Sequence, residues 1–269
     1  MKHLIKHVTR YRYSAPVNYT IQTLRLTPRA DDHQRALRWQ ISAPGPLTEQ
    51  VDAYGNVTHT LTLNHPHNEI EIRVTGQIEI DPLDQGMIHG EDSRLPLHAY
   101  CVPTPLTQCD ENIRQLCREA VPNGIHTPQD LLALAGAICD RVTYEPGYTD
   151  VTTAADQVLA LGHGVCQDHA HLFLACVRGL GLPARYVSGY HYANAADDVA
   201  SSHAWADVWL PNQGWVSVDI TNRALTSDNH CRLAVARDYD SASPVRGVRN
   251  GGGEESMTIS VQVQRAKQQ

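Results

Sequence analysis

The sequence contains no long apolar run and no cysteine pair of the Cys-x-x-Cys type. Nowhere do about 18 apolar residues follow one another, which argues against a membrane-spanning helix. Residues 1–10 alternate charged and apolar side chains and build no apolar signal core, so export is not expected. The seven cysteines show no regular disulfide spacing. We therefore expect a cytoplasmic protein in which most thiols are reduced and act as small buried groups.

An excess of basic residues is also missing. The chain has 22 Lys and Arg against 29 Asp and Glu, a net charge of -7, and the basic residues form no stripe or terminal arm. Nucleic acids and anionic membrane surfaces are therefore not expected partners. With 269 residues and 42% hydrophobic content, the chain is long enough for one large domain or two modest ones.

The first third of the chain has a period of two in its apolar residues, which is typical of half-buried β-strands. Turn residues separate the runs, and no helical period appears. The runs predict strands at Val8–Tyr13, Gln22–Leu26, Leu37–Ile41, Val57–Leu63 and Ile70–Ile80. Residues 81–107 lose this alternation and contain four prolines, which indicates a connection between two units. We predict an N-terminal antiparallel β-sandwich over residues 1–90 and a second domain over residues 91–269.

The second domain begins with helical patterns and continues with strands. Thr127 is a typical N-cap residue and Pro128 suits the first helical position. Helices are predicted at 110–120, from Pro128 onward, and at 166–180, the last ended by Gly181-Leu182-Pro183. Strands are predicted at 184–192, 203–210, 215–219, 232–235 and 257–263. Helices followed by an antiparallel sheet give an α+β fold.

Cys166 differs from the other cysteines by its position where a glycine loop, Gly162 to Gly164, becomes a helix. A helix start turns amide hydrogens and the positive end of the helix dipole toward the sulfur, which favours the reactive thiolate. The backbone N–H of Cys166 is also a candidate donor to the oxyanion formed in acyl transfer. Cys139 and Cys176 lie within apolar runs and are interpreted as buried side chains.

His203 and Asp219 are the candidate partners of this thiol. The segment Pro211-Asn212-Gln213-Gly214 between their strands is typical of a hairpin turn. If Leu210 pairs with Gly214, Asp219 falls opposite Trp205 and diagonal to His203 on the same sheet face. Asp219 would then orient the imidazole, His203 would transfer the proton, and Cys166 would attack the acyl carbon.

A metal site is the alternative use of the histidines beside Cys166. His169 and His171 are two residues apart and point to different sides of a helix, unlike the i, i+4 spacing that places two ligands on one face. We therefore predict no metal and no cofactor, and interpret His163, His169 and His171 as helix or loop residues.

Four segments carry a resemblance to a known family. They are Gly164-Val-Cys-Gln-Asp-His-Ala-His-Leu172, residues 181–190, Ser202-His-Ala-Trp205 and Gly214-Trp-Val-Ser-Val-Asp219. They resemble the bacterial transglutaminase-like family of the papain-like superfamily, whose members are described as cysteine proteases. The segment around Leu24-Arg25-Leu26-Thr27-Pro28-Arg29 is similar to the β-sandwich region that precedes the core in that family. The resemblance implies a transglutaminase-like core of helices packed on an antiparallel sheet, with the nucleophile at Cys166, the base at His203 and the acid at Asp219.

Two positions depart from the family pattern. Ile220 stands where relatives commonly have a proline, and no tryptophan precedes the nucleophile in the core to serve as an oxyanion donor. Tyr144 is a candidate donor, with a packed aromatic ring as the alternative interpretation.

The expected activity is acyl transfer from a peptide or amide bond through a thioester, with water as the acceptor. An amine acceptor would make the protein a transamidase, and Asp197 and Asp198 could attract such an amine, although a solvated acidic loop is the simpler interpretation. A non-catalytic peptide-binding module on the same fold is the third possibility.

Overall fold

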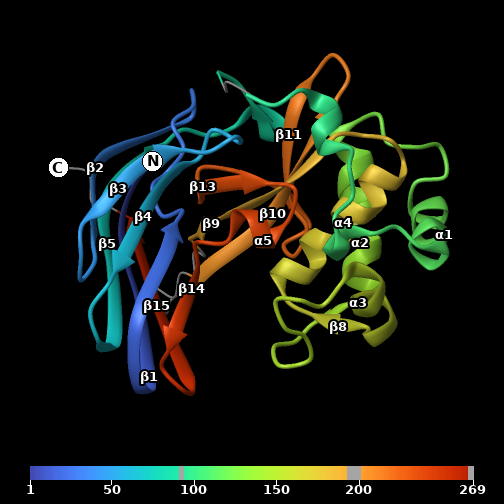
Figure 1. Ribbon diagram of the computed structural model, residues 1–269. Coiled ribbons are helices and arrows are strands. Elements are labelled where there is room, and N and C mark those ends of the chain that lie inside the picture. Colours follow the sequence, from blue (N-terminus) through green and yellow to red (C-terminus); the bar gives the residue numbers. More distant parts are fainter. Residues whose placement is uncertain (91–93, 193–200, 266–269) are drawn as a thin grey trace.

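A computed structural model describes residues 1–90, 94–192 and 201–265 of the chain. Figure 1 shows three layers: a large sheet on the left, a second sheet in the middle and a group of helices on the right. Both sheets are antiparallel. The predicted α+β class is therefore confirmed.

The first sheet is organised around β1, a strand of 23 residues. Between His3 and Tyr13 the odd-numbered side chains are buried and most even-numbered ones are exposed, as the period of two predicts. β4 and β5 lie end to end along one edge of β1, and β14 and β15 lie end to end along the other. The strands of this sheet are β1 (Lys2–Leu24), β2 (Gln34–Ser42), β3 (Leu47–Val51), β4 (Val57–Leu63), β5 (His67–Ile80), β14 (Val245–Gly251) and β15 (Glu255–Arg265).

The C-terminal strands correct the predicted domain division. The segment 257–263 was expected in the second domain, but it forms part of β15, which pairs with β1 from His3↔Arg265 to Tyr13↔Glu255. The predicted division into 1–90 and 91–269 therefore misassigns β14 and β15. The physical reason is that β1 lies in the middle of the sheet, where its backbone N–H and C=O groups pair on both edges, with β4 and β5 on one edge and β14 and β15 on the other. Gly251, Gly252 and Gly253, all with positive φ, allow the sharp change of direction between β14 and β15.

The second sheet has the order β12-β11-β10-β9-β13, with β6 beside β11. Its strands are β6 (Met87–Ile88), β9 (Ala184–His191), β10 (Ser201–Leu210), β11 (Gly214–Asp219), β12 (Ala224–Leu225) and β13 (His230–Ala236). The helices of the third layer are α1 (Glu111–Ala120), α2 (Pro128–Arg141), α3 (Ala155–Leu161) and α4 (Cys166–Gly179), and the short α5 is Tyr239–Ala242. The two-residue strands β7 (Thr143–Tyr144) and β8 (His163–Gly164) pair in parallel beside them.

The two sheets pack face to face and form the two layers of a sandwich. Ile5, Ile72 and Val74 of the first sheet share a core with Tyr190 and Leu233 of the second. Polar side chains also cross the interface at defined points. The His7 Nδ1 lies 2.6 Å from the Tyr190 hydroxyl, and the Asn56 amide bonds both the N–H and the C=O of Val235 at 2.9 and 2.8 Å. These bonds satisfy buried polar groups and fix the first sheet on the second.

The helical layer covers the opposite face of the second sheet. Ala204, Ala206 and Val208 of β10 point into a core shared with α4, whose residues from Asp168 to Arg178 are all buried. Arg178, near the end of α4, donates to carbonyl oxygens of Tyr100, Ala184 and Arg237, so its buried charge is hydrogen-bonded. The helix that begins at Cys166 is thus the central support of the domain.

Within the described residues, no helix is long and apolar enough to span a lipid bilayer.

Candidate active site

Cys166 is the first residue of α4, as the sequence predicts. Asp168 fixes this start because its carboxylate accepts hydrogen bonds from the Val165 N–H at 2.7 Å and from the Thr149 hydroxyl at 2.6 Å. Gly164 allows the close approach, since a Cβ there would lie 2.8 Å from the Asp168 Cβ. Cys166 as a residue is half-buried, unlike the fully buried Cys117, Cys176 and Cys231.

The hairpin between β10 and β11 has the predicted register. Leu210 pairs with Gly214 and Ala206 with Val218, which places Asp219 one step beyond Val218 on the face that carries Trp205. The side chains of His203 and Asp219 meet on that face, with 2.8 Å between His203 Nε2 and Asp219 Oδ2. Because Nε2 contacts the carboxylate, Nδ1 is the ring nitrogen left for the thiol.

Three further groups hold the Asp219 carboxylate, and sequence reasoning missed them. The His230 Nε2 lies 3.0 Å from Oδ2, and the Asn222 side chain donates to the same oxygen at 2.6 Å. The Asn222 backbone N–H donates to Oδ1 at 3.1 Å. His230 stands at the start of a strand behind a turn, where no residue pattern distinguishes it from an ordinary turn histidine. Its contact with Asp219 arises only when β13 is placed in the sheet.

The electrostatics of this cluster favour an ion pair. Burial opposes the charged form of His203, but its interactions with Asp219 and with the Cys166 thiol raise the pKa of the imidazole to about 10. Burial likewise opposes ionisation of Asp219, yet hydrogen bonds from His203 and His230 hold the pKa of its carboxyl well below the ordinary range. The geometry therefore stabilises an imidazolium at His203 next to the Cys166 side chain.

Tyr144 lies near the thiol at the surface. It pairs with Gly164 through the β7–β8 contact, and its ring centroid is 6.2 Å from that of His169. Tyr144 is 53% exposed. Partial burial of the hydroxyl and, to a lesser extent, the nearby Cys166 raise its pKa. Tyr144 therefore remains a predicted oxyanion donor. Asp197 and Asp198 lie outside the described residues.

The histidines beside Cys166 have separate partners. The His169 ring contacts the Thr221 hydroxyl at 3.0 Å and the Val142 carbonyl at 3.1 Å, whereas the His171 Nε2 accepts from the Tyr239 N–H. These contacts direct the two rings to different parts of the core. They match the sequence interpretation of both as helix residues.

Among the described residues, His191, Asp219 and His230 form a group whose ligand atoms lie within 4.8 Å of one another. The tautomer of His230 argues against a metal there. Its Nδ1 accepts the Ser227 N–H at 3.2 Å, so in the neutral ring the proton is on Nε2 and points at Asp219. A metal ligand needs a lone pair at that nitrogen. The group therefore suits a hydrogen-bonded carboxylate better than a bound cation.

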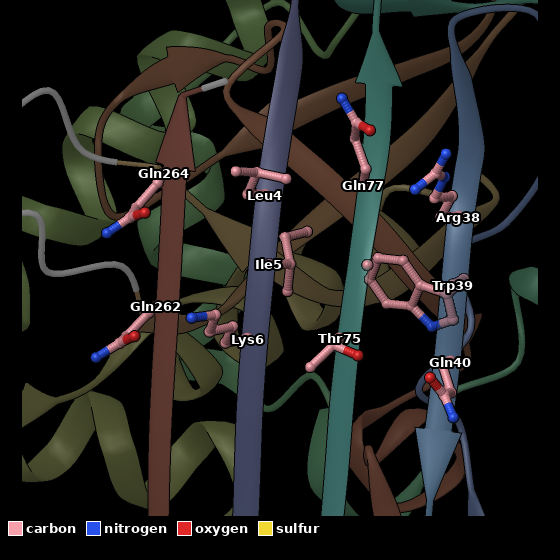
Figure 2. Close-up of a pocket in the computed structure, with 11 residues that line it drawn as sticks. Leu4, Ile5, Lys6, Arg38, Trp39, Gln40, Thr75, Gln77, Gln262 and Gln264 are labelled. Atoms are coloured by element: carbon pink, nitrogen blue, oxygen red, sulfur yellow. The ribbon is translucent and has the colours of Figure 1, made fainter. Parts of the chain in front are cut away.

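A pocket of about 760 Å³ lies on the first sheet, away from this site. Figure 2 shows its side chains on β15, β1, β5 and β2, with Trp39 between β5 and β2 and Gln262 and Gln264 on β15. None of its lining residues belongs to the second sheet or to the helices. No residue of the candidate active site lines it.

The sequence was compared with protein families and with individual proteins. Residues 114–220 match the transglutaminase-like superfamily, and residues 4–79 match the bacterial transglutaminase-like N-terminal region. An uncharacterized protein of Mycobacterium leprae is 28% identical over 277 residues, which cover 97% of this chain and 98% of that protein. A protein-glutamine gamma-glutamyltransferase of Pseudomonas aeruginosa is 36% identical over 103 residues, 33% of this chain and 15% of that protein.

A solved structure has the same overall fold. The crystal structure of a "Putative Cysteine Protease" from Cytophaga hutchinsonii matches 100% of this chain and 92% of its own with a TM-score of 0.80, at 20% sequence identity. The match extends over the first sheet as well as the core. The two matched regions show that the chain has a transglutaminase-like core preceded by the bacterial transglutaminase-like N-terminal region, and the structural match shows the same fold over both.

Proposed function

We propose that this protein is a cysteine-dependent acyl-transfer enzyme that cleaves a peptide or amide bond through a Cys166 thioester. The observation that carries the proposal is the position of His203, whose Nε2 contacts Asp219 while its ring also interacts with the Cys166 thiol. This arrangement gives each of the three residues one role in a nucleophile–base–acid series.

The first half of the reaction forms the thioester. The Cys166 thiolate attacks the amide carbon, and the carbonyl oxygen takes the negative charge of the tetrahedral intermediate. The Cys166 N–H, at the start of α4, is one donor to that oxyanion, and Tyr144 is the second candidate. The C–N bond then breaks, and the leaving amine takes the proton from His203 Nδ1.

The second half releases the acyl group. A water molecule attacks the thioester carbon while His203 Nδ1 accepts one of its protons, and the C–S bond breaks to return the thiolate and a carboxylic acid. An amine in place of water would give a new amide and make the protein a transamidase. The similarity to the glutamyltransferase of Pseudomonas aeruginosa favours keeping that second candidate. We place hydrolysis first because water needs no acceptor site.

Selective alkylation tests whether Cys166 is the nucleophile. At about pH 6.5, where an ordinary thiol is mostly protonated, iodoacetamide should label Cys166 much faster than the other six cysteines. The His203→Ala variant should lose this advantage. Equal labelling of several cysteines in the wild-type protein would instead support the non-catalytic peptide-binding module.

The acceptor is tested separately with dimethylated casein as the acyl donor and dansylcadaverine as the amine. Hydrolysis predicts new carboxylates or peptide ends without dansyl incorporation, whereas a transamidase would incorporate the dye in a Cys166-dependent way.

The cytoplasmic location is also a proposal. It is supported by the seven cysteines, all within the described residues and none of them in a disulfide.

A further inference from the structure

A groove of about 400 Å³ lies between the first sheet and the catalytic layer. One wall is formed by inner-face residues of β1, including Tyr11, Tyr13 and Gln22, together with β14 and β15. The facing wall is formed by Tyr239 and by the loop at Val151 before α3. In Figure 1, α5 lies between β14 and the helical layer, at this junction. We call this site the Tyr239 groove.

The Tyr239 groove lies next to the candidate nucleophile. The Gln167 amide, directly after Cys166 in α4, donates to the Val151 carbonyl at 3.4 Å. In the wall formed by α5, burial is the main cause that raises the pKa of the Tyr239 hydroxyl, and the nearby Cys166 is the second cause. The Val151 loop of the groove is therefore bonded to the start of α4, and Tyr239 is near enough to Cys166 for the thiol to affect the pKa of its hydroxyl.

Two buried polar atoms of the groove have no hydrogen-bond partner among the described residues. They are the Gln22 Oε1 and the Ser243 Oγ, in side chains that are 6% and 4% exposed. Leaving such atoms unpaired is costly, and both residues line the groove, so a ligand whose complementary groups reach these atoms as it binds would satisfy them. Gly247 gives the Gln22 side chain its space, because a Cβ there would lie 2.7 Å from the Gln22 Cγ.

The charges of the groove are already paired. Arg246 forms an ion pair with Asp240, and Arg249 lies 3.1 Å from the Glu255 carboxylate. The remaining lining is aromatic, aliphatic or neutral polar, with Tyr11 and Val245 as examples. A charged ligand would gain no unpaired partner from these side chains. The groove therefore suits an uncharged chain with both hydrogen-bond donors and acceptors.

We propose that the Tyr239 groove binds the acyl portion of the substrate, an extended peptide segment with uncharged side chains. The Gln22 oxygen accepts a peptide N–H, and the Ser243 hydroxyl donates to a peptide carbonyl. The first sheet thereby contributes to specificity as well as supporting the core. This inference rests on the proposed acyl-transfer function.

The test compares alkylating agents of increasing length. Acetyl-alanyl chloromethyl ketone and its acetyl-tetrapeptidyl homologue, built from alanine and leucine, both react with an activated thiol, but only the longer one fills the groove. The wild-type protein should react about 25-fold faster with the longer reagent, as expected for two additional hydrogen bonds that each contribute about fivefold. A glutamate or lysine within the tetrapeptide should remove most of this gain.

Variants assign the gain to the groove. Gln22→Met and Ser243→Ala should each slow labelling by the tetrapeptidyl reagent about fivefold while leaving the iodoacetamide rate of Cys166 unchanged. Gln262→Met and Ser260→Ala, exposed positions on β15, are matched controls that should change neither rate. Equal rates for the short and long reagents, or no loss in Gln22→Met, would overturn the proposed groove.

Failure of the acyl-transfer proposal is recognised independently, because iodoacetamide would then show no preference for Cys166. In that case the groove is tested by calorimetry with an acetyl-tetrapeptide amide and the Cys166→Ala variant. Binding that Gln22→Met weakens about fivefold would support the groove without the chemistry. No binding would overturn it.

Discussion

Replacing Asp219 with asparagine tests the electrostatic core of the site. Three donors converge on Oδ2, from His203, His230 and the Asn222 side chain, and the Asn222 N–H meets Oδ1. An asparagine amide has one oxygen and one NH₂ group. If its oxygen takes the Oδ2 position, its NH₂ meets the Asn222 N–H; if it is flipped, its NH₂ faces His203. Either orientation places two donors against each other.

The magnitude follows from the pKa of His203, which is raised to about 10 from 6.5. Since the folded-state pKa exceeds the unfolded one, the imidazolium stabilises the fold fully below about pH 6.5, and this contribution is lost as the pH rises through about 10. At about 1.4 kcal/mol per pKa unit, the imidazolium contributes at most about 5 kcal/mol to the free energy of unfolding. Its interactions with Asp219 and with Cys166 share this contribution. We expect Asp219→Asn to lower the free energy of unfolding by about 2–4 kcal/mol at neutral pH.

The assay combines urea unfolding between about pH 6.5 and 10 with an NMR titration of the His203 ring nitrogens. The variant should lose a large part of the pH dependence of stability, and its His203 pKa should fall well below about 10, because burial is then opposed only by the interaction with Cys166. The turnover number should fall about 10³- to 10⁴-fold, as expected when an orienting acid is removed. Asp140→Asn, at an exposed ion pair with Arg223, is the control and should cost less than about 1 kcal/mol. An unchanged His203 titration in Asp219→Asn would refute the reasoning.

Two further predictions concern the support of the site. His230→Phe removes one donor from Asp219 and should lower the free energy of unfolding by about 1–3 kcal/mol in thermal unfolding, with a smaller loss of turnover than Asp219→Asn; an equal loss would mean that His230 itself takes part in the chemistry. Gly164→Ala places a methyl 2.8 Å from the Asp168 Cβ and should slow Cys166 alkylation and destabilise the fold by about 1–3 kcal/mol. Gly136→Ala, mid-α2 with no atom within 4 Å of the added Cβ, should be neutral or stabilising by up to about 1 kcal/mol, and equal effects of the two substitutions would contradict this assignment.

Local signals explain which parts of the structure could be predicted. The helix start at Cys166 is indicated by the glycines before it, and the register of the hairpin is determined by the short turn after Leu210. Both depend on residues within a few positions of one another. The contact of His203 with Asp219 follows from that register alone.

The parts that were missed depend on long-range pairing. β1 was expected as two strands, Val8–Tyr13 and Gln22–Leu26, yet it continues from Lys2 to Leu24 between long partners. The pairing of β15 with β1 joins opposite ends of the chain, and no local pattern specifies it. His230 reaches Asp219 for the same reason, through the position of β13 in the sheet.

The central claim is that Cys166 carries the acyl group. The most direct test is to mix the protein with p-nitrophenyl acetate, quench within the first turnover, and map the acetyl group by mass spectrometry. The account predicts a burst of about one nitrophenolate per protein and an acetyl thioester on Cys166, both lost in His203→Ala. An acetyl group spread over several cysteines, or a Cys166 thioester that forms as fast without His203, would contradict it.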